Sequence, residues 1–297
     1  MNKASTYLLS LIFSVFLVFL MIAGSAVLLF DINFTPNKLK KLADKKDTES
    51  KIYTEIDKYY SDKYNTTGIP ADVYMSAVDK GYIKLCEYSY IDCAFESLKS
   101  GTKLSMTLPK NNDLEENIDS FFNDFAEKNN YGKDENFDAK LAVSRENAYS
   151  SIGSFCDIYK FSSMSEHGVL TPLSKVYTLR MIMTAAVIAA NIVIILLLIA
   201  INRKKKITAM YWCGISSLIA GIIGSVPSIY LTATRFYDSF SIKQAPVFAV
   251  FTGAMYKYTE AFIAVMIAFI VVGISLIVTY GVIHDKKKYP NTKPTEI

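Results

Sequence analysis

Four long apolar runs dominate this sequence, and they restrict the chain to a membrane-embedded fold. They cover residues 7–29, 179–201, 207–231 and 261–283, and the one charged residue inside them is Arg180, at the edge of the second. A hydrocarbon core of about 30 Å is crossed by about 20 helical residues at about 1.5 Å each, so every run is long enough to span it. Since such a core offers the backbone no water to bind, we predict four membrane-spanning helices.

Basic residues indicate which side of the membrane each connection faces. Residues 202–206, between the second and third runs, contain Arg-Lys-Lys-Lys, and three consecutive lysines lie near the start of the segment 284–297. Short cytoplasmic connections retain Lys and Arg, so both segments are predicted to be cytoplasmic. After four crossings both termini are cytoplasmic, and residues 31–178 and 232–260 are external. The sequence thus predicts a multi-pass protein of the cell membrane.

The net charge of +4 is explained by this topology. The predicted cytoplasmic segments hold nine basic and two acidic residues, whereas residues 31–178 hold nineteen basic and twenty-four acidic ones. A nucleic-acid-binding protein concentrates its basic residues in a patch or stripe, and none is visible here. The partner that we predict first is the lipid bilayer, and we expect no nucleic acid.

The first run also resembles a signal peptide at one point. Residues 23–26 are Ala-Gly-Ser-Ala, a small-residue stretch of the kind that precedes a cleavage site. The apolar run passes through this stretch and ends at Phe30, beyond the about 7–15 residues of a secretory apolar region. We therefore expect residues 1–30 to form a short cytoplasmic N-terminus and an uncleaved anchor. Cleavage would instead leave three spans and an external N-terminus.

The segment 31–178 has ordinary soluble composition and enough length to bury a core of its own. Apolar side chains recur at intervals of three and four, as on amphipathic helices, in stretches that start near Leu85, Leu114 and Leu141. Gly101 is expected to end the first stretch, and Asn111 is one of the N-cap candidates of the second. Weaker helices are expected at 38–60 and 71–80, and a short strand is possible at 103–108. The predicted fold class is an all-α membrane protein, with four transmembrane helices and a mainly helical external domain between the first and second.

Three cysteines belong to the predicted external domain. Cys86 and Cys93 are seven residues apart on one predicted helix, which separates them by about 10 Å along its axis and prevents a mutual disulfide. A disulfide between Cys156 and either Cys86 or Cys93 is possible, and one external thiol would then remain free. Buried unpaired thiols are the equally weighted alternative.

Inside the predicted spans we find residues suited to close helix packing rather than to transport. Asn191 is the strongest polar residue at mid-membrane and is expected to bond a neighbouring helix. Ser217, Gly221 and Gly224 lie at the intervals of small residues that let two helices approach closely. Such contacts form within one chain or between copies, so the oligomeric state stays open. A closed apolar groove that reached Asn191 would favour lipid handling.

The predicted external loop 232–260 contains an apolar stretch at 245–256 that is too short to span. Phe248, Phe251 and Tyr256 are its candidates for interfacial or partner contact. The stretch has three possible positions: against the large external domain, in the interfacial lipid, or at a partner.

The sequence contains no catalytic, cofactor-binding or metal-ligating motif that we recognise. There are two histidines and four cysteines, and the phosphate-binding, zinc-helix and nucleophile-elbow patterns are absent. The leading interpretation is a non-enzymatic membrane protein that displays its external helical domain for binding, sensing or scaffolding, with a possible protein partner there. The C-terminal residues 289–297 are expected to form a disordered cytoplasmic tail.

Two alternatives remain. The order of spans and external segments resembles, in topology only, the FtsX and MacB type of permease, which implies a transport-related subunit working with a partner ATPase. The six residues before the first span and the five between the second and third are fewer than that family uses. An envelope enzyme would instead show a cluster of polar side chains at the outer surface.

Overall fold

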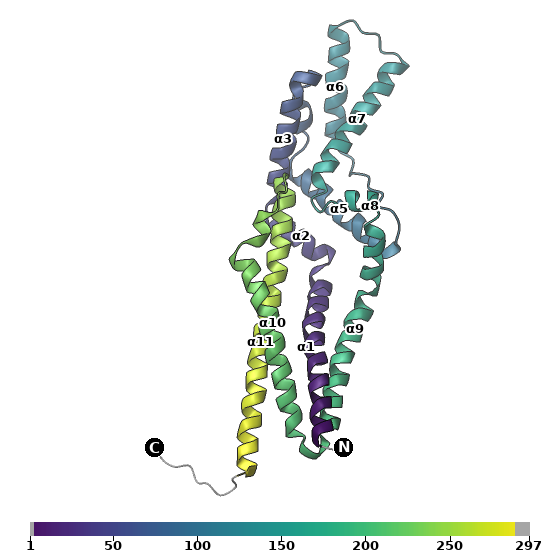
Figure 1. Ribbon diagram of the computed structural model, residues 1–297. Helices are drawn as coiled ribbons and strands as arrows, with labels where there is room; N and C mark the ends of the chain where they lie inside the picture. Colours follow the sequence, from purple (N-terminus) through teal and green to yellow (C-terminus); the bar gives the residue numbers. More distant parts are fainter. Residues whose placement is uncertain (1–2, 289–297) are drawn as a thin grey trace. The chain divides into compact units, whose positions relative to one another are not determined.

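The computed structural model describes residues 3–288, and its regular elements there are all helices. The predicted C-terminal tail at 289–297 lies outside the described residues. The α-helices are α1 (Lys3–Asn33), α2 (Pro36–Lys45), α3 (Thr48–Thr67), α4 (Asp72–Met75), α5 (Lys80–Ser100), α6 (Asn112–Lys128), α7 (Glu135–Cys156), α8 (Phe161–Glu166), α9 (Leu170–Ile201), α10 (Ile207–Ala233) and α11 (Ala245–Lys288), with short 3₁₀ turns at Arg203–Lys205 and Phe236–Ser239 (Figure 1).

The chain divides into two compact units. One, which we call the span unit, consists of residues 1–33, 179–240 and 255–297. The other, which we call the helical domain, consists of residues 34–178 and 241–254. The helical domain is therefore assembled from two segments that are far apart in the sequence.

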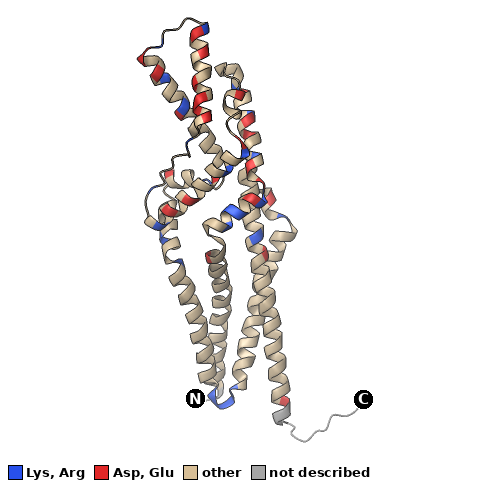
Figure 2. Ribbon diagram, turned by 180° about the vertical axis from the view of Figure 1, so that it is seen from behind, with Lys and Arg blue, Asp and Glu red and all other residues tan. Residues whose placement is uncertain are grey.

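Four helices are long and apolar enough to cross a membrane, as the sequence predicts: α1, α9, α10 and α11. Their bounds differ from those of the apolar runs, because the helices extend past the ends of the runs. The second begins at Leu170 rather than at residue 179, and the fourth begins at Ala245 rather than at residue 261. The Lys and Arg residues near the α9–α10 connection are visible in Figure 2, whereas the spans carry few charges.

Helix α10 is the best-buried helix of the span unit. Of its most apolar stretch 44% is buried, against 6% for α9. A Cβ atom on Gly221 would lie 2.6 Å from the carbonyl oxygen of Met266, so glycine is what allows the backbones of α10 and α11 to meet there. On the α1 side, the hydroxyls of Ser14 and Ser216 are hydrogen-bonded at 2.6 Å.

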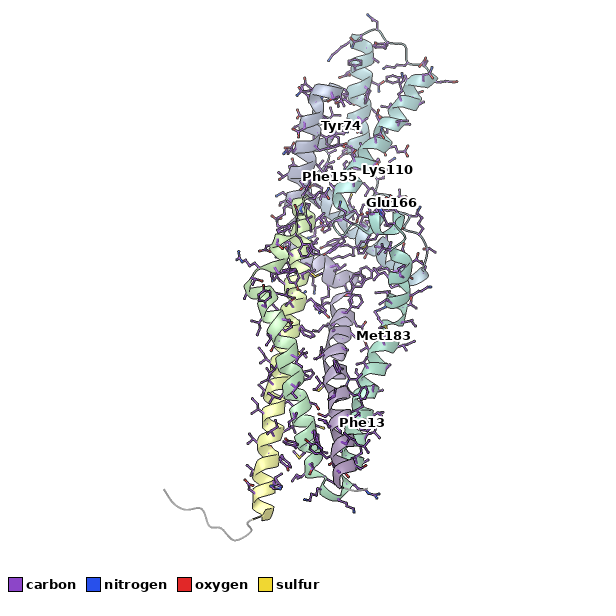
Figure 3. The ribbon with its side chains drawn as sticks, in the orientation of Figure 1. Phe13, Tyr74, Lys110, Phe155, Glu166 and Met183 are labelled. Atoms are coloured by element: carbon purple, nitrogen blue, oxygen red, sulfur yellow. The ribbon has the colours of Figure 1, made fainter. Side chains whose placement is uncertain are left out.

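The core of the helical domain lies where α3, α5, α6 and α7 meet. Ile52, Ile83, Leu114 and Ile152, one from each of these helices, are fully buried in the same cluster. The rings of Tyr60 and Tyr74, the second of which is labelled in Figure 3, stack with centroids 3.9 Å apart. A second cluster gathers around Phe95, whose ring contacts Phe34, Phe161 and Tyr177.

Local signals explain several helix ends. The Asn111 side chain accepts a hydrogen bond from the Leu114 N–H and so caps α6. Gly101, with φ +72°, ends α5 in the left-handed conformation that glycine adopts without strain. Both ends agree with the sequence-based expectation.

Four expectations need correction. The weak helix at 71–80 is only the short α4, Asp72–Met75, and residues 76–79 are not helical. The weak helix expected at 38–60 is two helices, because Asp47 has a φ of 49° and this left-handed conformation interrupts the helix between α2 and α3. Residues 103–108 form no strand: the described chain offers them no ladder partner, and they remain an irregular connection. The stretch 245–256 is not a loop but the first part of α11.

The position of this first part of α11 was left open by the sequence. Val250 is 1% exposed and belongs to the main core cluster of the helical domain. The Ala245 N–H donates to the Glu55 carboxylate at 2.7 Å, and a Cβ atom on Gly253 would meet the Lys46 side chain. Residues 245–254 therefore pack as part of the helical domain.

Candidate functional site

One exposed feature of the helical domain is the hairpin of α6 and α7, which lie side by side in Figures 1 and 2. Leu114 and Ile118 of α6, together with Ala148 and Ile152 of α7, anchor its base in the main core. Beyond this base the two helices continue to the connection at 129–134. The hairpin is therefore fixed at one end and free to present side chains at the other.

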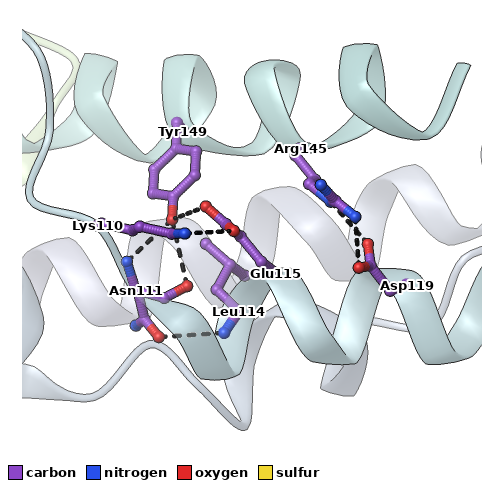
Figure 4. A network of polar contacts seen from close by, with 7 residues as sticks. All are labelled: Lys110, Asn111, Leu114, Glu115, Asp119, Arg145 and Tyr149. Atoms are coloured by element: carbon purple, nitrogen blue, oxygen red, sulfur yellow. Dashed lines mark hydrogen bonds and ion pairs between the residues drawn. The ribbon is translucent and has the colours of Figure 1, made fainter. Parts of the chain in front are cut away.

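A polar network at the base sets the register between the two helices (Figure 4). The Asn111 N–H donates to the Tyr149 hydroxyl at 2.9 Å, and the same hydroxyl lies 3.1 Å from the Glu115 carboxylate. The Asn111 amide also donates to the Ala77 carbonyl at 2.8 Å. Lys110 pairs with Glu115 at 3.3 Å. This network ties α6 both to α7 and to the segment after α4.

Further along the hairpin, Arg145 of α7 binds Asp119 of α6 with two parallel hydrogen bonds (Figure 4). Its Nε donates to one carboxylate oxygen at 2.6 Å, and its second nitrogen donates to the other. Both side chains are about one-third exposed, so solvent reduces the stabilising effect of the pair to about 1 kcal/mol or less. The geometry nevertheless holds the two helices in one register.

The end of the hairpin exposes aromatic rings. Phe125 is 51% exposed and Tyr131 is 65% exposed, and their rings stack with centroids 6.2 Å apart. Asn130, at φ 52°, makes the turn between them. Paired, exposed aromatic side chains are the residue type that anchors protein interfaces.

Acidic side chains outnumber basic ones over the hairpin as a whole. Residues 111–150 contain ten acidic and four basic side chains. In the part of the chain that the structure describes, Glu115, Asp119 and Glu127 form ion pairs, so most of the acidic charge there is not neutralised by a neighbour. Figure 2 shows the acidic residues along both helices. The hairpin as a whole, with its exposed rings, is therefore suited to a partner surface that is basic and partly apolar.

A buried carboxyl group lies deeper in the helical domain. Glu87 of α5 is 1% exposed and accepts a hydrogen bond at 2.7 Å from the Thr48 hydroxyl, which is itself fully buried. Burial raises the pKa of Glu87 to about 7, an effect that the bond from Thr48 opposes and the nearby Glu49 and Asp44 carboxylates reinforce. The sequence did not predict the burial of Glu87, because a glutamate whose side chain lies in the core and one whose side chain lies at the surface look the same in the sequence.

The three cysteines of the helical domain comprise two buried neighbours and one separate thiol. Cys86 and Cys156 are fully buried in the main core cluster, where the interaction with Cys86 and burial raise the pKa of the Cys156 thiol. Cys93 is only partly buried, and its thiol donates to the Ser105 carbonyl at 3.1 Å. All are free thiols in this structure. Of the two pairings that the sequence left open, the structure places Cys86 next to Cys156.

The residues expected to pack the spans lie at helix contacts. The Asn191 amide donates to Val187 of its own helix at 2.9 Å and to the Leu20 carbonyl of α1 at 3.4 Å. The Ser217 hydroxyl donates to the Phe269 carbonyl of α11 at 2.8 Å. Gly221 and Gly224 face Met266 of α11.

The aromatic residues of the first part of α11 are divided between the two units. Phe248 and Phe251 belong to the helical domain and are partly buried. Tyr256 belongs to the span unit, where its ring lies edge-on to Tyr237 at 5.1 Å.

In the described residues no group of three or more His, Cys, Asp or Glu side chains is arranged to hold a metal ion. Comparison of the chain with protein-family models, with curated proteins and with solved structures found no match.

Proposed function

We propose that this chain is a multi-pass protein of the cell membrane that holds its helical domain outside the cytoplasm and uses the α6–α7 hairpin to bind a protein partner. Both termini are then cytoplasmic. The four apolar helices and the basic connection at 203–206 support the topology. The single observation that carries the binding role is the exposed pair Phe125 and Tyr131 at the end of a hairpin that carries more acidic than basic side chains.

The partner that fits this surface is a basic protein segment with apolar side chains. Aromatic residues contribute most of the energy of such contacts, while the surrounding charge guides association and excludes acidic surfaces. Of the three roles considered for the helical domain, we therefore propose binding rather than sensing or scaffolding.

The topology is tested with single cysteines in a variant whose four native cysteines are replaced by Ala. Position 143 lies on α7 and is 53% exposed, and position 204 lies in the basic connection. A membrane-impermeant maleimide is expected to label Val143→Cys in intact cells and Lys204→Cys only after permeabilisation. The reverse pattern would refute the proposed orientation.

Binding is tested with a photoreactive amino acid at position 125, using position 85 as the matched control. Phe125 and Leu85 are 51% and 52% exposed in the same domain, on α6 and α5. We expect a discrete crosslinked product from position 125 that is lost when Tyr131→Ser and Asp124→Lys are added. Equal crosslinking from both positions would count against the hairpin. A stoichiometric ATPase or permease subunit as the captured protein would favour the transport-related alternative.

A further inference from the structure

Aromatic side chains gather at both ends of the span unit. The first aromatic cluster lies in the part of α10 that follows the connection at 202–206, and rings from three span helices form it: Tyr7 of α1, Tyr211 and Trp212 of α10, and Tyr280 of α11. The Trp212 ring lies edge-on to Tyr7 with centroids 5.3 Å apart, and the centroids of Tyr211 and Tyr280 are 5.2 Å apart. The three helices therefore present aromatic rings at one level.

The second aromatic cluster lies just after the other end of α10. Phe236 and Tyr237 belong to the short 3₁₀ turn Phe236–Ser239, and Phe240 follows it. The Phe236 ring lies 5.7 Å from the Phe240 ring, and the Tyr237 ring lies 5.1 Å from that of Tyr256. Phe236 and Phe240 are 44% and 43% exposed. These two rings therefore contact each other and still present much of their surface to the surroundings.

The distance between the two ends matches the thickness of a hydrocarbon core. On α10, Trp212 and the 64% exposed Tyr230 are eighteen residues apart, which is about 27 Å at about 1.5 Å per residue. No charged residue lies between them. On α11, the twenty residues from 261 to Tyr280 are also free of charge and cover about 30 Å. Because the core of a bilayer is about 30 Å thick, both helices give the same two boundaries.

Arg235 limits how deep the second aromatic cluster can lie. Its side chain is exposed, and it directly precedes Phe236 in the sequence. A guanidinium group is costly inside the hydrocarbon core, so Arg235 has to remain at the level of the lipid phosphates. Exposed phenylalanine rings are instead favoured at the boundary between headgroups and acyl chains. These neighbouring side chains are therefore both accommodated where the bilayer changes from polar to apolar.

We propose that the exposed rings of Phe236 and Phe240 insert into the headgroup interface of the outer leaflet and anchor the end of α10 there. A protein partner would require no particular distance from the first aromatic cluster, whereas a bilayer requires the spacing that α10 and α11 show. The choice of the outer leaflet rests on the orientation proposed above. The insertion itself depends neither on that orientation nor on the function of the α6–α7 hairpin.

The test uses the fluorescence of a single tryptophan in the full chain, reconstituted in phosphatidylcholine vesicles. Trp212 is the only tryptophan, so Trp212→Phe provides a background into which Phe236→Trp is introduced. Vesicles are prepared with lipids brominated either near the glycerol or near the end of the acyl chain, because bromine quenches tryptophan at short range. We expect the shallow bromines to quench Phe236→Trp severalfold more than the deep ones. Equal fluorescence with and without brominated lipid would refute the insertion.

Two control variants in the same background calibrate the depth. Ile223 is 55% exposed on α10 and lies eleven residues after position 212, near the middle of the core, so the deep bromines should quench Ile223→Trp most. This result also shows that the background variant is folded and inserted. Phe125 is 51% exposed at the end of the hairpin, so neither lipid should quench Phe125→Trp. If Phe236→Trp behaved like either control, the proposed interfacial position would be wrong.

A second measurement distinguishes lipid from protein as the partner of these rings. A photoreactive amino acid replaces Phe240 in the otherwise unchanged chain, and native membranes are irradiated. We expect mass spectrometry to find phospholipid adducts at position 240 and no discrete protein product. A stoichiometric crosslink to another protein, or to a second copy of this chain, would overturn the proposal.

Discussion

Replacement of Glu87 by Gln should change how the stability of the helical domain depends on pH. In the folded chain burial raises the pKa of Glu87 from 4.5 to about 7, so the folded state keeps the proton over a range in which the unfolded chain has lost it. The folded state therefore binds more protons between these two values, and its stability falls as pH rises through this window. Above about pH 7 the full cost of the buried negative charge is present.

The size of the effect follows from the pKa shift. Each pKa unit corresponds to about 1.4 kcal/mol, so the wild-type domain should lose about 3 kcal/mol between pH 4.5 and 7 because of this one group. Glu87→Gln removes the titration and keeps an oxygen that accepts the Thr48 hydrogen bond. It should therefore be more stable than the wild type by about 2–3 kcal/mol at pH 8 and nearly equal to it at pH 4.5.

The assay is amide hydrogen exchange on the full chain in lipid nanodiscs, corrected for the intrinsic pH dependence of exchange. The free energy of opening is followed at amides of α3 and α5, which surround Glu87. Glu96→Gln, an exposed position on the same helix, is the control and should show no pH-dependent difference from the wild type. A difference between Glu87→Gln and the wild type that stays constant from pH 4.5 to 8 would refute the reasoning.

Three further predictions concern single contacts. Asn111→Ala removes the cap of α6 and the amide bond to Ala77, and should destabilise the domain by about 1–2 kcal/mol in urea unfolding, whereas an unchanged midpoint would contradict this role. Gly221→Val places a Cβ atom against the Met266 backbone and should lower the melting temperature of the detergent-purified chain, while Gly281→Val, in open space, should not. In a glutathione disulfide buffer Cys156 should pair with Cys86 and leave Cys93 open to alkylation; a Cys93–Cys156 peptide would refute this.

The spans were the part of the fold that the sequence predicted best. A run without charges indicates a span whatever face it presents, so α1, α9, α10 and α11 were found without knowledge of their packing. The end at Gly101 was also predicted, and Asn111 was among the cap candidates, because both signals depend on local residue types. These signals are local, and no distant contact alters them.

The parts that the sequence missed depend on distant contacts. Lys257 and Glu260 interrupt the apolar pattern and suggest a loop, whereas α11 passes through them without a break. Asp47 ends a helix with neither glycine nor proline to mark the position. Glu87 is buried, and its hydrogen-bond partner Thr48 is thirty-nine positions away in the sequence.

The division of the helical domain into residues 34–178 and 241–254 has a consequence for biosynthesis. The main core stays incomplete until Val250 has been translated, after the third apolar helix. At about 5–20 residues per second, the ribosome needs on the order of 4–15 s to pass from residue 178 to residue 254. During this interval the position of Val250 in the core is unoccupied. The helical domain is therefore completed only after the third apolar helix and residues 241–254 have been synthesised.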